Sequence, residues 1–435
     1  MTHPRRRAGL AAALALVVAA LAGCSESTPT AAPSASATDS ASSRAKACAA
    51  VVDEIVTATQ QYVDTYGPLP VGGSASRTPS AASTAGPDGD FKQALADAQR
   101  NLTDLGCDVA AAQTDLAAGL GRVTARGPVA TAVLLQTKAA ITGRLPKDPV
   151  KRTVSPADDL AVALSEAPSG STITLRAGTY TLKDALVLLT GVTLKGAGRD
   201  TTLIRSPGAD ATVLVLTGDR VTLTGLAVAH TGSRPASVLL GGPDVSLALT
   251  GVRLSGARAD AQGQGGAGVL MSARGTATTT ATATTLEMTG VDVTGNGAAG
   301  VVLAGNHRVS ILTSQFRANG QCGVCFLDAS SGSVQGSTFT ANAVGVVATG
   351  SARPTLIANT FTGGQVGVQA SGSSVPVLSR NTMSRMARAA IILTGPVTGR
   401  IDGTVCRAVK FGIVLSPTSL PDLGTNSCTV ARSKT

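Results

Sequence analysis

The sequence predicts a mainly β fold, a solenoid of stacked strands preceded by a small α-helical module. Glycine-valine pairs, or close variants of them, recur in the last third of the 435 residues at steps of 22 or 23. A second apolar series keeps the same register, seven or eight residues before each valine-like residue, so one coil is about 22 residues long. The two series are Gly300-Val301, Gly323-Val324, Gly345-Val346, Gly367-Val368, Ala390-Ile391 and Gly412-Ile413, and Val293, Phe316, Phe339, Phe361, Met383 and Val405.

The composition of the repeat favours strands over helices. The repeats are rich in Val, Thr, Ser, Asn and Gly and alternate locally, as in Val301-Val302-Leu303, a pattern typical of strands. One coil cannot bury its apolar face alone, but stacked coils can, because strands about 4.8 Å apart place equivalent residues above one another. A β-sandwich with fortuitous spacing is the rival fold. Three further series support the stacking: Thr338, Thr360, Thr382 and Thr404; Asn359 and Asn381; Pro354 and Pro376.

The segment before the repeats completes a recognisable pattern. Ser155-Pro156 is expected to cap and start a short helix through Ala167, followed by a strand-like run from Ser169 to Tyr180 and a first full turn over 191–198. With this order, residues 155–430 resemble the right-handed parallel β-helix proteins of the pectate lyase-like superfamily. The resemblance implies that the helix plugs the open end of the coil stack. It also implies that an enzyme of this kind would gather Asp, Arg, His or Tyr in one groove along a parallel sheet.

The first 23 residues carry the marks of an export signal. Three arginines at 5–7 precede an apolar run over 8–20, which has the length of a signal-peptide core and is short for a membrane span. The run ends at Leu21-Ala22-Gly23-Cys24, which resembles a bacterial lipobox. The resemblance implies a signal peptide over 1–23, acylation of Cys24 with palmitate-type chains, and anchoring at the outer face of the bacterial cytoplasmic membrane. An ordinary secretion signal with an incidental cysteine is the alternative.

Charge and composition describe the region that follows. Loss of 1–23 removes three arginines and lowers the formal net charge from +10 to +7. A basic chain favours anionic partners such as acidic glycans, teichoic acids or lipid head groups; the alternative is solvated scatter, since only 14% of the residues are charged. Residues 24–44 are almost all Ser, Thr, Ala and Pro, so we expect a flexible tether there.

Between residues 45 and 150 the apolar spacing becomes that of helices. Steps of four and three form a stripe in each of two segments, which predicts two amphipathic helices. Two more helices are expected near 108–124 and 128–143, with a loop rich in Gly, Pro and Ser over 67–90. The module is either a spacer and N-terminal support or a partner-binding unit. The stripes are Val52, Ile55, Thr59, Tyr62 and Tyr66, and Phe91, Leu95, Ala98, Leu102 and Leu105.

Six of the seven cysteines remain once Cys24 is assigned to the lipid, and an even number outside the cytosol suggests disulfides. Antiparallel helices would place Cys48 beside Cys107, and a spacing of one coil would place Cys406 beside Cys428. Cys322 and Cys325 lie on a Gly-Val step, where a bridge requires a turn because an extended strand separates the sulfurs too far. This context argues against a redox site, whereas a structural bridge, free or labile thiols, and a metal pair all stay open for these two.

Candidate catalytic residues are few. Glycoside hydrolysis needs two carboxylates, and metal-assisted lyase chemistry needs an acidic cluster for calcium and a base. Asp292 stands just before a core position, but Gln315 and then threonines hold the equivalent place in later coils, so no carboxylates stack. Asp260 and His307 complete the candidates, although His230 and His307 are interpreted as satisfied or exposed loop residues rather than ligands. No metal site and no cofactor are expected.

The loops between 228 and 301 are the expected location of any site. The valine-like steps Val238, Val269 and Val301 widen there to 31 and 32 residues, so extra loops project from the stack, and such insertions often form the binding face. A merely decorative loop rich in Gly, Ala and Thr is the alternative. The candidate residues for binding an acidic sugar are Arg253, Arg258 and Arg274.

These features favour a lipid-anchored, non-catalytic β-helix protein of the cell envelope. We expect a monomer that presents a rigid surface to anionic polysaccharide or to another envelope protein and has no nucleic-acid partner. The alternative is a polysaccharide lyase, hydrolase or epimerase with its site in the loops over 240–310. A resemblance to β-helix accessory proteins of copper-enzyme maturation gives a third possibility, which the scarcity of His and Met in the coils disfavours. A groove with clustered carboxylates would favour an enzyme, and one lined by Thr, Ser and Ala a binder.

Overall fold

The computed structural model describes residues 35–66, 86–242, 245–272 and 284–433. The expected signal peptide, Cys24 and Arg274 lie outside these residues. The described chain forms two compact units, a helical unit within 35–150 and 161–168 and a solenoid unit within 151–160 and 169–433. In the described ranges, no helix combines the length and apolar character needed to cross a membrane.

The helical unit consists, in its described part, of four helices and a short one. Their bounds are α2 Ala35–Asp64, α3 Gly86–Asp104, α4 Val109–Arg122, α5 Pro128–Ile141 and α6 Leu160–Ser165. Most residues of the two predicted apolar stripes are buried, for example Ile55 and Leu95. The side chain of Asp108 caps α4 by accepting the N–H of Ala111. Gly119 of α4 lies against Val56 of α2, where a Cβ atom would meet the valine methyl at 2.5 Å.

Two boundaries differ from the sequence-based expectation. Helix α2 begins at Ala35, so the last residues of the expected tether are helical, because this segment contains several alanines and alanine is the strongest helix former. The short helix begins at Leu160 rather than near Ser155, because the Asp158 carboxylate accepts the Ser155 N–H at 2.7 Å and closes a turn instead. Residues 161–168 belong to the helical unit, so a plug of the coil stack stays a prediction.

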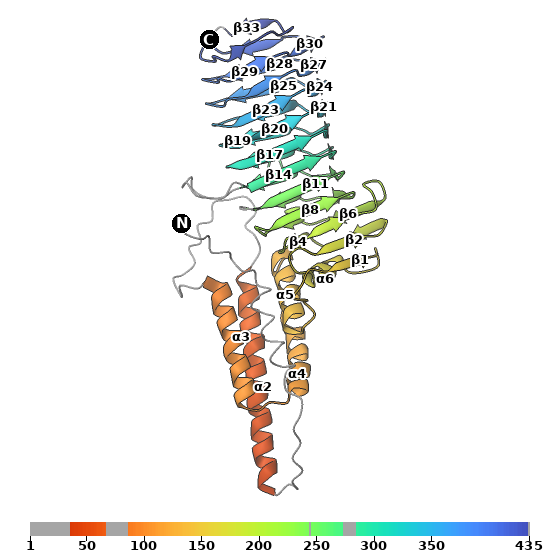
Figure 1. Ribbon diagram of the computed structural model, residues 1–435, viewed down its shortest axis with the longest axis vertical. Helices are drawn as coiled ribbons and strands as arrows, with labels where there is room; N and C mark the ends of the chain where they lie inside the picture. Colours follow the sequence, from red (N-terminus) through yellow and green to blue (C-terminus); the bar gives the residue numbers. More distant parts are fainter. Residues whose placement is uncertain (1–34, 67–85, 243–244, 273–283, 434–435) are drawn as a thin grey trace. The chain divides into compact units, whose positions relative to one another are not determined.

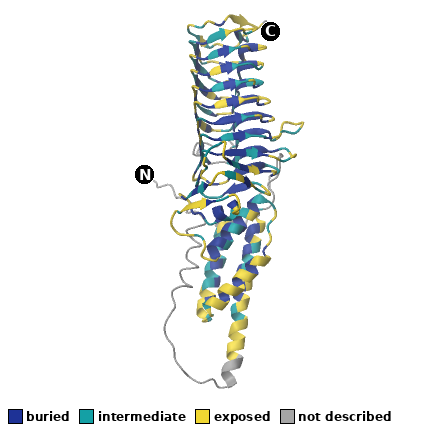
Figure 2. Ribbon diagram, turned by 90° about the vertical axis from the view of Figure 1, so that its right-hand side faces the viewer, coloured by how far each residue is buried: buried dark blue, intermediate teal, exposed yellow. Residues whose placement is uncertain are grey.

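The solenoid unit is a right-handed parallel β-helix of about 11 coils with about 23 residues per turn. Each full coil contributes one strand to each of three parallel sheets, here named sheets A, B and C, and the strands stack in sequence order (Figure 1). Buried residues alternate with partly or fully exposed ones along many of the strands (Figure 2).

The bounds of the strands follow. Sheet A contains β1 Lys151–Val154, β2 Thr172–Leu175, β5 Thr193–Lys195, β8 Arg220–Thr224, β11 Ser246–Thr250, β14 Thr284–Thr289, β17 His307–Leu312, β20 Ser331–Gln335, β23 Arg353–Ile357, β26 Val377–Ser379, β29 Arg400–Asp402 and β32 Asp422–Leu423. Sheet B contains β3 Gly178–Thr181, β6 Thr202–Ser206, β9 Ala227–His230, β12 Arg253–Ser255, β15 Asp292–Thr294, β18 Gln315–Arg317, β21 Thr338–Thr340, β24 Thr360–Thr362, β27 Thr382–Ser384 and β30 Val405–Arg407. Sheet C contains β4 Leu186–Leu188, β7 Ala211–Val215, β10 Ser237–Gly241, β13 Ala267–Ser272, β16 Ala299–Ala304, β19 Cys322–Leu327, β22 Val344–Ala348, β25 Val366–Ser371, β28 Ala389–Thr394, β31 Ile413–Leu415 and β33 Val430–Arg432.

A stack of phenylalanine rings fills the core behind sheet B. The ring centroids of Phe316, Phe339 and Phe361 lie 4.9 and 4.6 Å apart, with nearly parallel planes. The repeating glycine makes room for this stack, because a Cβ atom at Gly345 would meet Cδ1 of Phe361 at 2.4 Å. The two series seen in the sequence are therefore one packing arrangement, in which Gly300, Gly323 and Gly345 accommodate the ring of the following coil and Gly367 accommodates the side chain of Met383.

Left-handed corners and buried amides bracket the short strands of sheet B. Ala341 (φ 54°) follows β21 and Ala358 (φ 52°) precedes β24, and such residues turn the chain sharply. Beside the corners, buried asparagines stack from coil to coil and satisfy the turning backbone. Asn381 Oδ1 accepts two hydrogen bonds from Asn359, one from its backbone N–H at 3.0 Å and one from its side-chain Nδ2 at 3.1 Å. A second column, which we did not expect, contains Asn296, Asn319 and Asn342.

The register differs by one residue at two predicted positions. Cys406, not Val405, pairs with Met383, because this coil is one residue longer and Thr404 takes the corner position that asparagine holds before it. Likewise Leu239, not Val238, pairs with Val269. In both places the neighbouring residue is also apolar and small enough to imitate the repeat.

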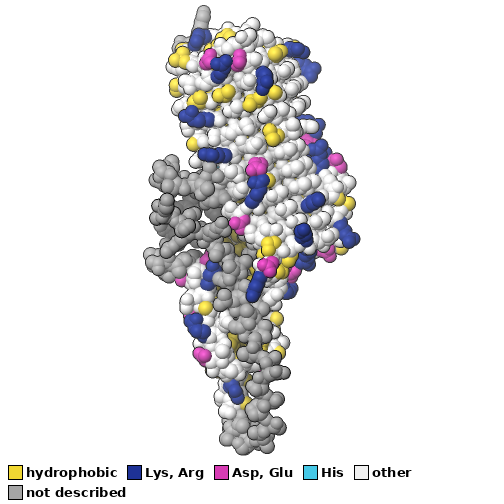
Figure 3. Space-filling view, in the orientation of Figure 1, with side chains coloured by type: hydrophobic (Ala, Val, Ile, Leu, Met, Phe, Trp, Pro, Cys, Tyr) yellow, Lys and Arg dark blue, Asp and Glu magenta, His cyan; other side chains and the backbone are white. Residues whose placement is uncertain are grey.

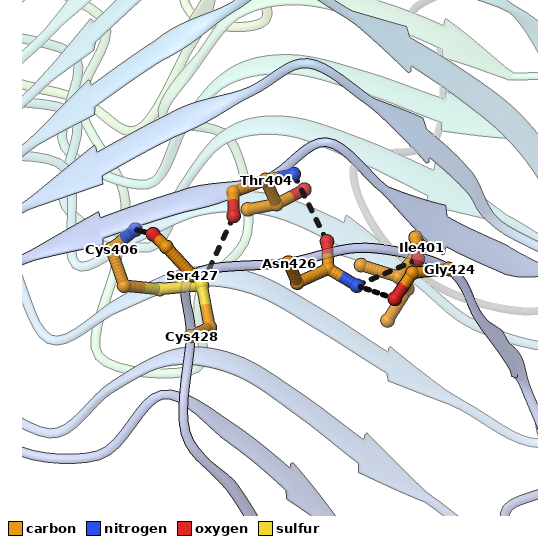
Figure 4. The surroundings of a disulfide bond; sticks show 7 residues. All are labelled: Ile401, Thr404, Cys406, Gly424, Asn426, Ser427 and Cys428. Atoms are coloured by element: carbon orange, nitrogen blue, oxygen red, sulfur yellow. Dashed lines mark hydrogen bonds between the residues drawn. A yellow bond between two sulfur atoms is a disulfide. The ribbon is translucent and has the colours of Figure 1, made fainter.

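Three disulfides connect the six cysteines of the described chain. Cys48 bonds to Cys107 with Cα atoms 5.8 Å apart, and Cys406 bonds to Cys428 at 5.0 Å. In the chain-entropy description, loops of these lengths contribute about 3 to 4 kcal/mol each. Around the last bridge, Asn426 accepts the Thr404 N–H at 2.9 Å and Ser427 accepts the Cys406 N–H at 3.2 Å (Figure 4). The final coil is thus held by covalent and hydrogen bonds together.

His307 and His230 lie in the interior of the coils, with exposed fractions of 1% and 5%. The Nε2 of His307 donates to the Ala304 carbonyl at 3.0 Å, and its Nδ1 contacts the Thr284 hydroxyl. Burial lowers the pKa of both histidines below the ordinary value. His307 is a satisfied residue, as expected. Both histidines, however, lie in strands, His230 in β9 and His307 in β17, and are buried rather than exposed in loops.

We predict that Phe361→Ala lowers the free energy of unfolding by about 3 to 5 kcal/mol, because it removes a buried ring and leaves a cavity. Thr360→Ala, one residue earlier and exposed, should cost less than about 0.5 kcal/mol. Urea unfolding of both variants measures the difference. Equal losses would contradict the assignment of Phe361 to the interior.

We also predict that stability falls as the solution is acidified through the histidine range. A folded-state pKa below the unfolded value of about 6.5 means that the unfolded chain binds more protons at low pH. The contribution is complete above pH 6.5 and is lost as the pH falls below it. His307→Gln should therefore flatten the decline in unfolding free energy between about pH 7.5 and 5.5. The exposed neighbour Arg308 offers the control, since Arg308→Gln should keep the wild-type slope.

Candidate functional site

The outer face of sheet B carries the sequence-predicted residues Arg253 and Asp292. Strands of this sheet present two outward columns, one on each side of the inward core residue, because side chains alternate along a strand. In the first column Arg253 pairs with Asp292 and Asp292 with Gln315. In the second column, Ser255 pairs with Thr294 and Thr294 pairs with Arg317.

Asp292 is the centre of an ion-pair cluster on this face. Although it points outward, its side chain is only 3% exposed, because arginines of the coils on both sides cover it. Its Oδ2 atom accepts from Arg253 Nε at 3.2 Å and from Arg317 Nη2 at 2.9 Å. Its Oδ1 atom is buried and has no hydrogen-bond partner among the described residues. The carboxylate is therefore neutralised by two guanidinium groups.

A loop from an earlier coil adds a second carboxylate and a third arginine. Asp200 Oδ1 lies 2.8 Å from Arg253 Nη1, and the Asp200 side chain is 71% exposed. Arg199 Nη1 donates to the Gly290 carbonyl at 3.2 Å, two residues before Asp292. Burial opposes the charge of Arg253, but its bonds to Asp292 and Asp200 outweigh burial and hold its pKa above the ordinary value. One arginine thus joins two aspartates from coils that are far apart in the sequence.

The other sequence-predicted candidates lie elsewhere. Asp260 Oδ1 accepts the backbone N–H groups of Gln262 and Gln264 at 3.0 and 2.7 Å, so this carboxylate stabilises its own loop. Arg258 is exposed on the same loop. His307 is buried inside the coils and cannot act on a ligand at the surface. Of the five candidates that the structure describes, it brings together only Arg253 and Asp292.

Beyond the Asp292 cluster, the outer face of sheet B becomes a strip of hydroxyl groups. We call it the hydroxyl strip, and its members are Thr338, Thr340, Thr360, Thr362, Thr382 and Ser384. All six are partly or fully exposed. Arg317 and Arg407 occupy the second column at its two ends. On the outward columns from β18 to β30, all of which are described, no acidic residue occurs.

The coils that bear the strip are strongly basic. Between Asp292 and Asp402 the sequence has a single acidic residue, Asp328. On the face seen in Figure 3, arginine and lysine side chains are spread over the solenoid with few acidic ones beside them. Arg380 and Arg385 are the left-handed corners at the two ends of β27, so they flank the strip directly. The arginines of this stretch are Arg308, Arg317, Arg353, Arg380, Arg385, Arg388 and Arg400.

The described residues contain no group of three or more His, Cys, Asp or Glu side chains arranged to hold a metal ion. Both described histidines of the coils are buried, and Cys322 and Cys325 are bonded to each other. The described residues therefore give no support to a copper accessory role.

Sequence reasoning missed Asp200 and the hydroxyl strip as a surface. Asp200 gave no signal, because it precedes the regular repeats and reaches Arg253 through an irregular loop. The strip did give a signal, since the threonine series at steps of 22 was noted, but only as support for stacking. A partner series lies two residues later in each coil, at Thr340, Thr362 and Ser384. Together the two series would have revealed a surface with two columns of hydroxyl groups.

Comparison with known proteins supports the architecture. Residues 280–434 match the family described as "Right handed beta helix region". No curated protein matches the sequence.

Several solved structures match part of the chain at low sequence identity. The ORF18 protein of Geobacillus virus E2 is 10% identical, with 65% of this chain and 61% of that chain covered and a TM-score of 0.43. The enzymatically active domain of tailspike protein 2 from bacteriophage CBA120 is 11% identical, with 61% and 47% covered and a TM-score of 0.44. The alginate lyase AlyGC is 13% identical, with 66% of this chain and 40% of that chain covered and a TM-score of 0.35.

The chain thus spans about three fifths and about half of the first two of these structures. These sequence identities and TM-scores do not show a shared activity. The solenoid unit, with its three parallel sheets and its match over 280–434, is a right-handed parallel β-helix.

Proposed function

We propose that this protein is a non-catalytic binder of anionic glycan, and that an extended polymer lies along the outer face of sheet B. The observation that carries the proposal is the hydroxyl strip, with a guanidinium group at each end and no carboxylate on its outward columns. Hydroxyl groups offer both a donor and acceptors to sugar hydroxyls, and arginine binds carboxylate, sulfate or phosphate through two parallel hydrogen bonds.

The dimensions of the strip suit a polymer rather than a single sugar. Four coil steps separate Arg317 from Arg407, which at about 4.8 Å per strand gives roughly 19 Å. Within each coil the two columns are about 6.7 Å apart, because they are two residues apart along a strand. The ligand would therefore contact repeating hydroxyl rows over several sugar units and meet a guanidinium group at both ends. That of Arg317 is 47% exposed although one of its nitrogens bonds to Asp292.

The candidate catalytic groups are already engaged in the structure. Asp292 is covered and paired with Arg253 and Arg317. Asp260 binds its own loop, and His307 is buried. This occupancy favours binding over catalysis.

A polysaccharide-active enzyme is the second candidate, favoured by one specific observation. Asp200 and Asp292 both bind Arg253, so their carboxylates lie within the reach of one guanidinium group. Glycoside hydrolysis uses two carboxylates about 5 to 9.5 Å apart. In that mechanism Asp200, which is exposed, would meet the substrate first, and Arg253 would orient both acids.

Membrane anchoring through Cys24 completes the proposal. The sequence Leu21-Ala22-Gly23-Cys24 motivates it. An acyl chain at this position would hold the β-helix at the outer face of the cytoplasmic membrane, where anionic cell-envelope polysaccharide or another envelope protein is the expected partner. The membrane would then concentrate the binding face near its ligand.

We predict that Arg317→Ala together with Arg407→Ala weakens binding to polyuronates about tenfold or more, because hydrogen bonds between charged groups are removed. Affinity for the wild-type protein should also fall as salt is raised, since exposed charges are screened over about 8 Å at physiological ionic strength. Calorimetry with pectate, alginate and hyaluronan at two salt concentrations measures both effects.

The matched control carries the same change of charge on another sheet. Arg308→Ala with Arg353→Ala removes two exposed arginines from sheet A and should leave affinity nearly unchanged. Equal losses in the two double variants would show that sheet B is not the binding face. If the wild-type protein releases unsaturated or reducing-end sugar and Asp292→Asn abolishes this release, the protein is a polysaccharide-active enzyme rather than a non-catalytic binder.

We further predict that Cys24→Ala abolishes membrane association and acyl labelling, because alanine lacks the sulfur atom to which the acyl chain would be attached. Fractionation and labelling with a clickable palmitate analogue measure the two properties. Normal labelling of the variant would refute the anchor and leave the binding proposal intact.

A further inference from the structure

The Cys322–Cys325 bridge differs from the other two disulfides in its position. It lies within a single strand, β19 of sheet C, and its Cα atoms are 6.0 Å apart. The strand bends at Gly323, which is left out of the pairing between coils, while Cys322 and Val324 pair on both sides of it. This bend supplies the turn that the sequence analysis required for a bridge.

The coil does not need this bridge in order to form. In the neighbouring coils the equivalent positions hold Ala299 with Val302 and Val344 with Val347, without any covalent link. Both cysteines keep their backbone pairing to the coils on each side. The bridge also closes the shortest loop of the three disulfides, with a sequence separation of 3 against 59 and 22, and the entropic effect of a cross-link grows with loop length.

The two sulfur-bearing residues differ in accessibility. Cys322 is fully buried, whereas Cys325 is partly exposed in an outward column between Val302 and Val347, which are also partly exposed. The surrounding outward positions of sheet C are uncharged. Of these two residues, only Cys325 is therefore open to a thiol from solution.

We propose that Cys322–Cys325 is an exchangeable disulfide that accepts two electrons from the dithiol of a partner protein. A thiolate of the partner attacks Sγ of Cys325, the S–S bond breaks, and its electron pair leaves with Sγ of Cys322, which takes up a proton. The second thiol of the partner then attacks the partner's own sulfur in the mixed disulfide and releases Cys325 as a thiol. The bridge is reduced to two thiols and the partner dithiol is oxidised to a disulfide, so electrons and protons balance.

The test uses the native full-length chain with dithiothreitol as the dithiol. After timed exposure, free thiols are alkylated and assigned by peptide mapping. Cys322 and Cys325 should be labelled at least about tenfold faster than Cys406 and Cys428, with no change in circular dichroism, because β19 stays paired to the coils on both sides when its bridge opens. Labelling of both pairs at the same rate would overturn the proposal.

Single variants separate exchange from mere exposure of the coil. In Cys322→Ala the remaining Cys325 should form a mixed disulfide with glutathione disulfide, whereas the remaining Cys322 in Cys325→Val should not. Cys322→Ala with Cys325→Val, which copies Ala299 and Val302, should keep the thermal midpoint within a few degrees of wild type, roughly the scale of a minor stability change. A large fall in that midpoint, like the one expected for Cys406→Ala with Cys428→Ala, would make the bridge structural and overturn the inference.

Discussion

Parallel pairing between successive coils is the interaction on which the rest of the solenoid depends. Each strand is hydrogen-bonded to the strands one coil before and one coil after it, so every residue is held above its equivalent. The phenylalanine stack, the glycines that accommodate it and the two asparagine columns all require this register. An extra residue is tolerated only at a corner, because an insertion within a strand would move every following side chain to the opposite face.

This constraint explains how much of the fold the sequence revealed. The glycine and phenylalanine series identified the coil length, the stacking of strands and the interior face, because a strict period leaves few alternatives. The reasoning failed by one residue at Val405 and Val238, where an adjacent apolar residue imitates the repeat and the true coil length differs. It also placed the start of α2 too late, because the alanine-containing segment before it has helix propensity but no apolar stripe to reveal it.

The surface was harder to predict than the interior for a physical reason. Outward residues are not selected by packing, so their function depends on neighbours that only the coil register brings together. Arg253 and Asp292 were identified, but their contact was not, and Asp200 lies on an irregular loop without a period. The short strands of sheet B offer two outward positions per coil, so a surface can change one row at a time while the core stays the same.

The Cys406–Cys428 bridge has a mechanical consequence. A solenoid pulled along its axis from the C-terminal side unwinds coil by coil, because the rows of backbone bonds are loaded one after another. A force applied beyond Cys428 crosses the disulfide directly to Cys406, so the residues within the 22-residue separation bear no tension. The load instead reaches β30, the last strand of sheet B, where Cys406 pairs with Met383 of the preceding coil. Peeling from that side must then begin at β30, while the residues between the two cysteines carry no load.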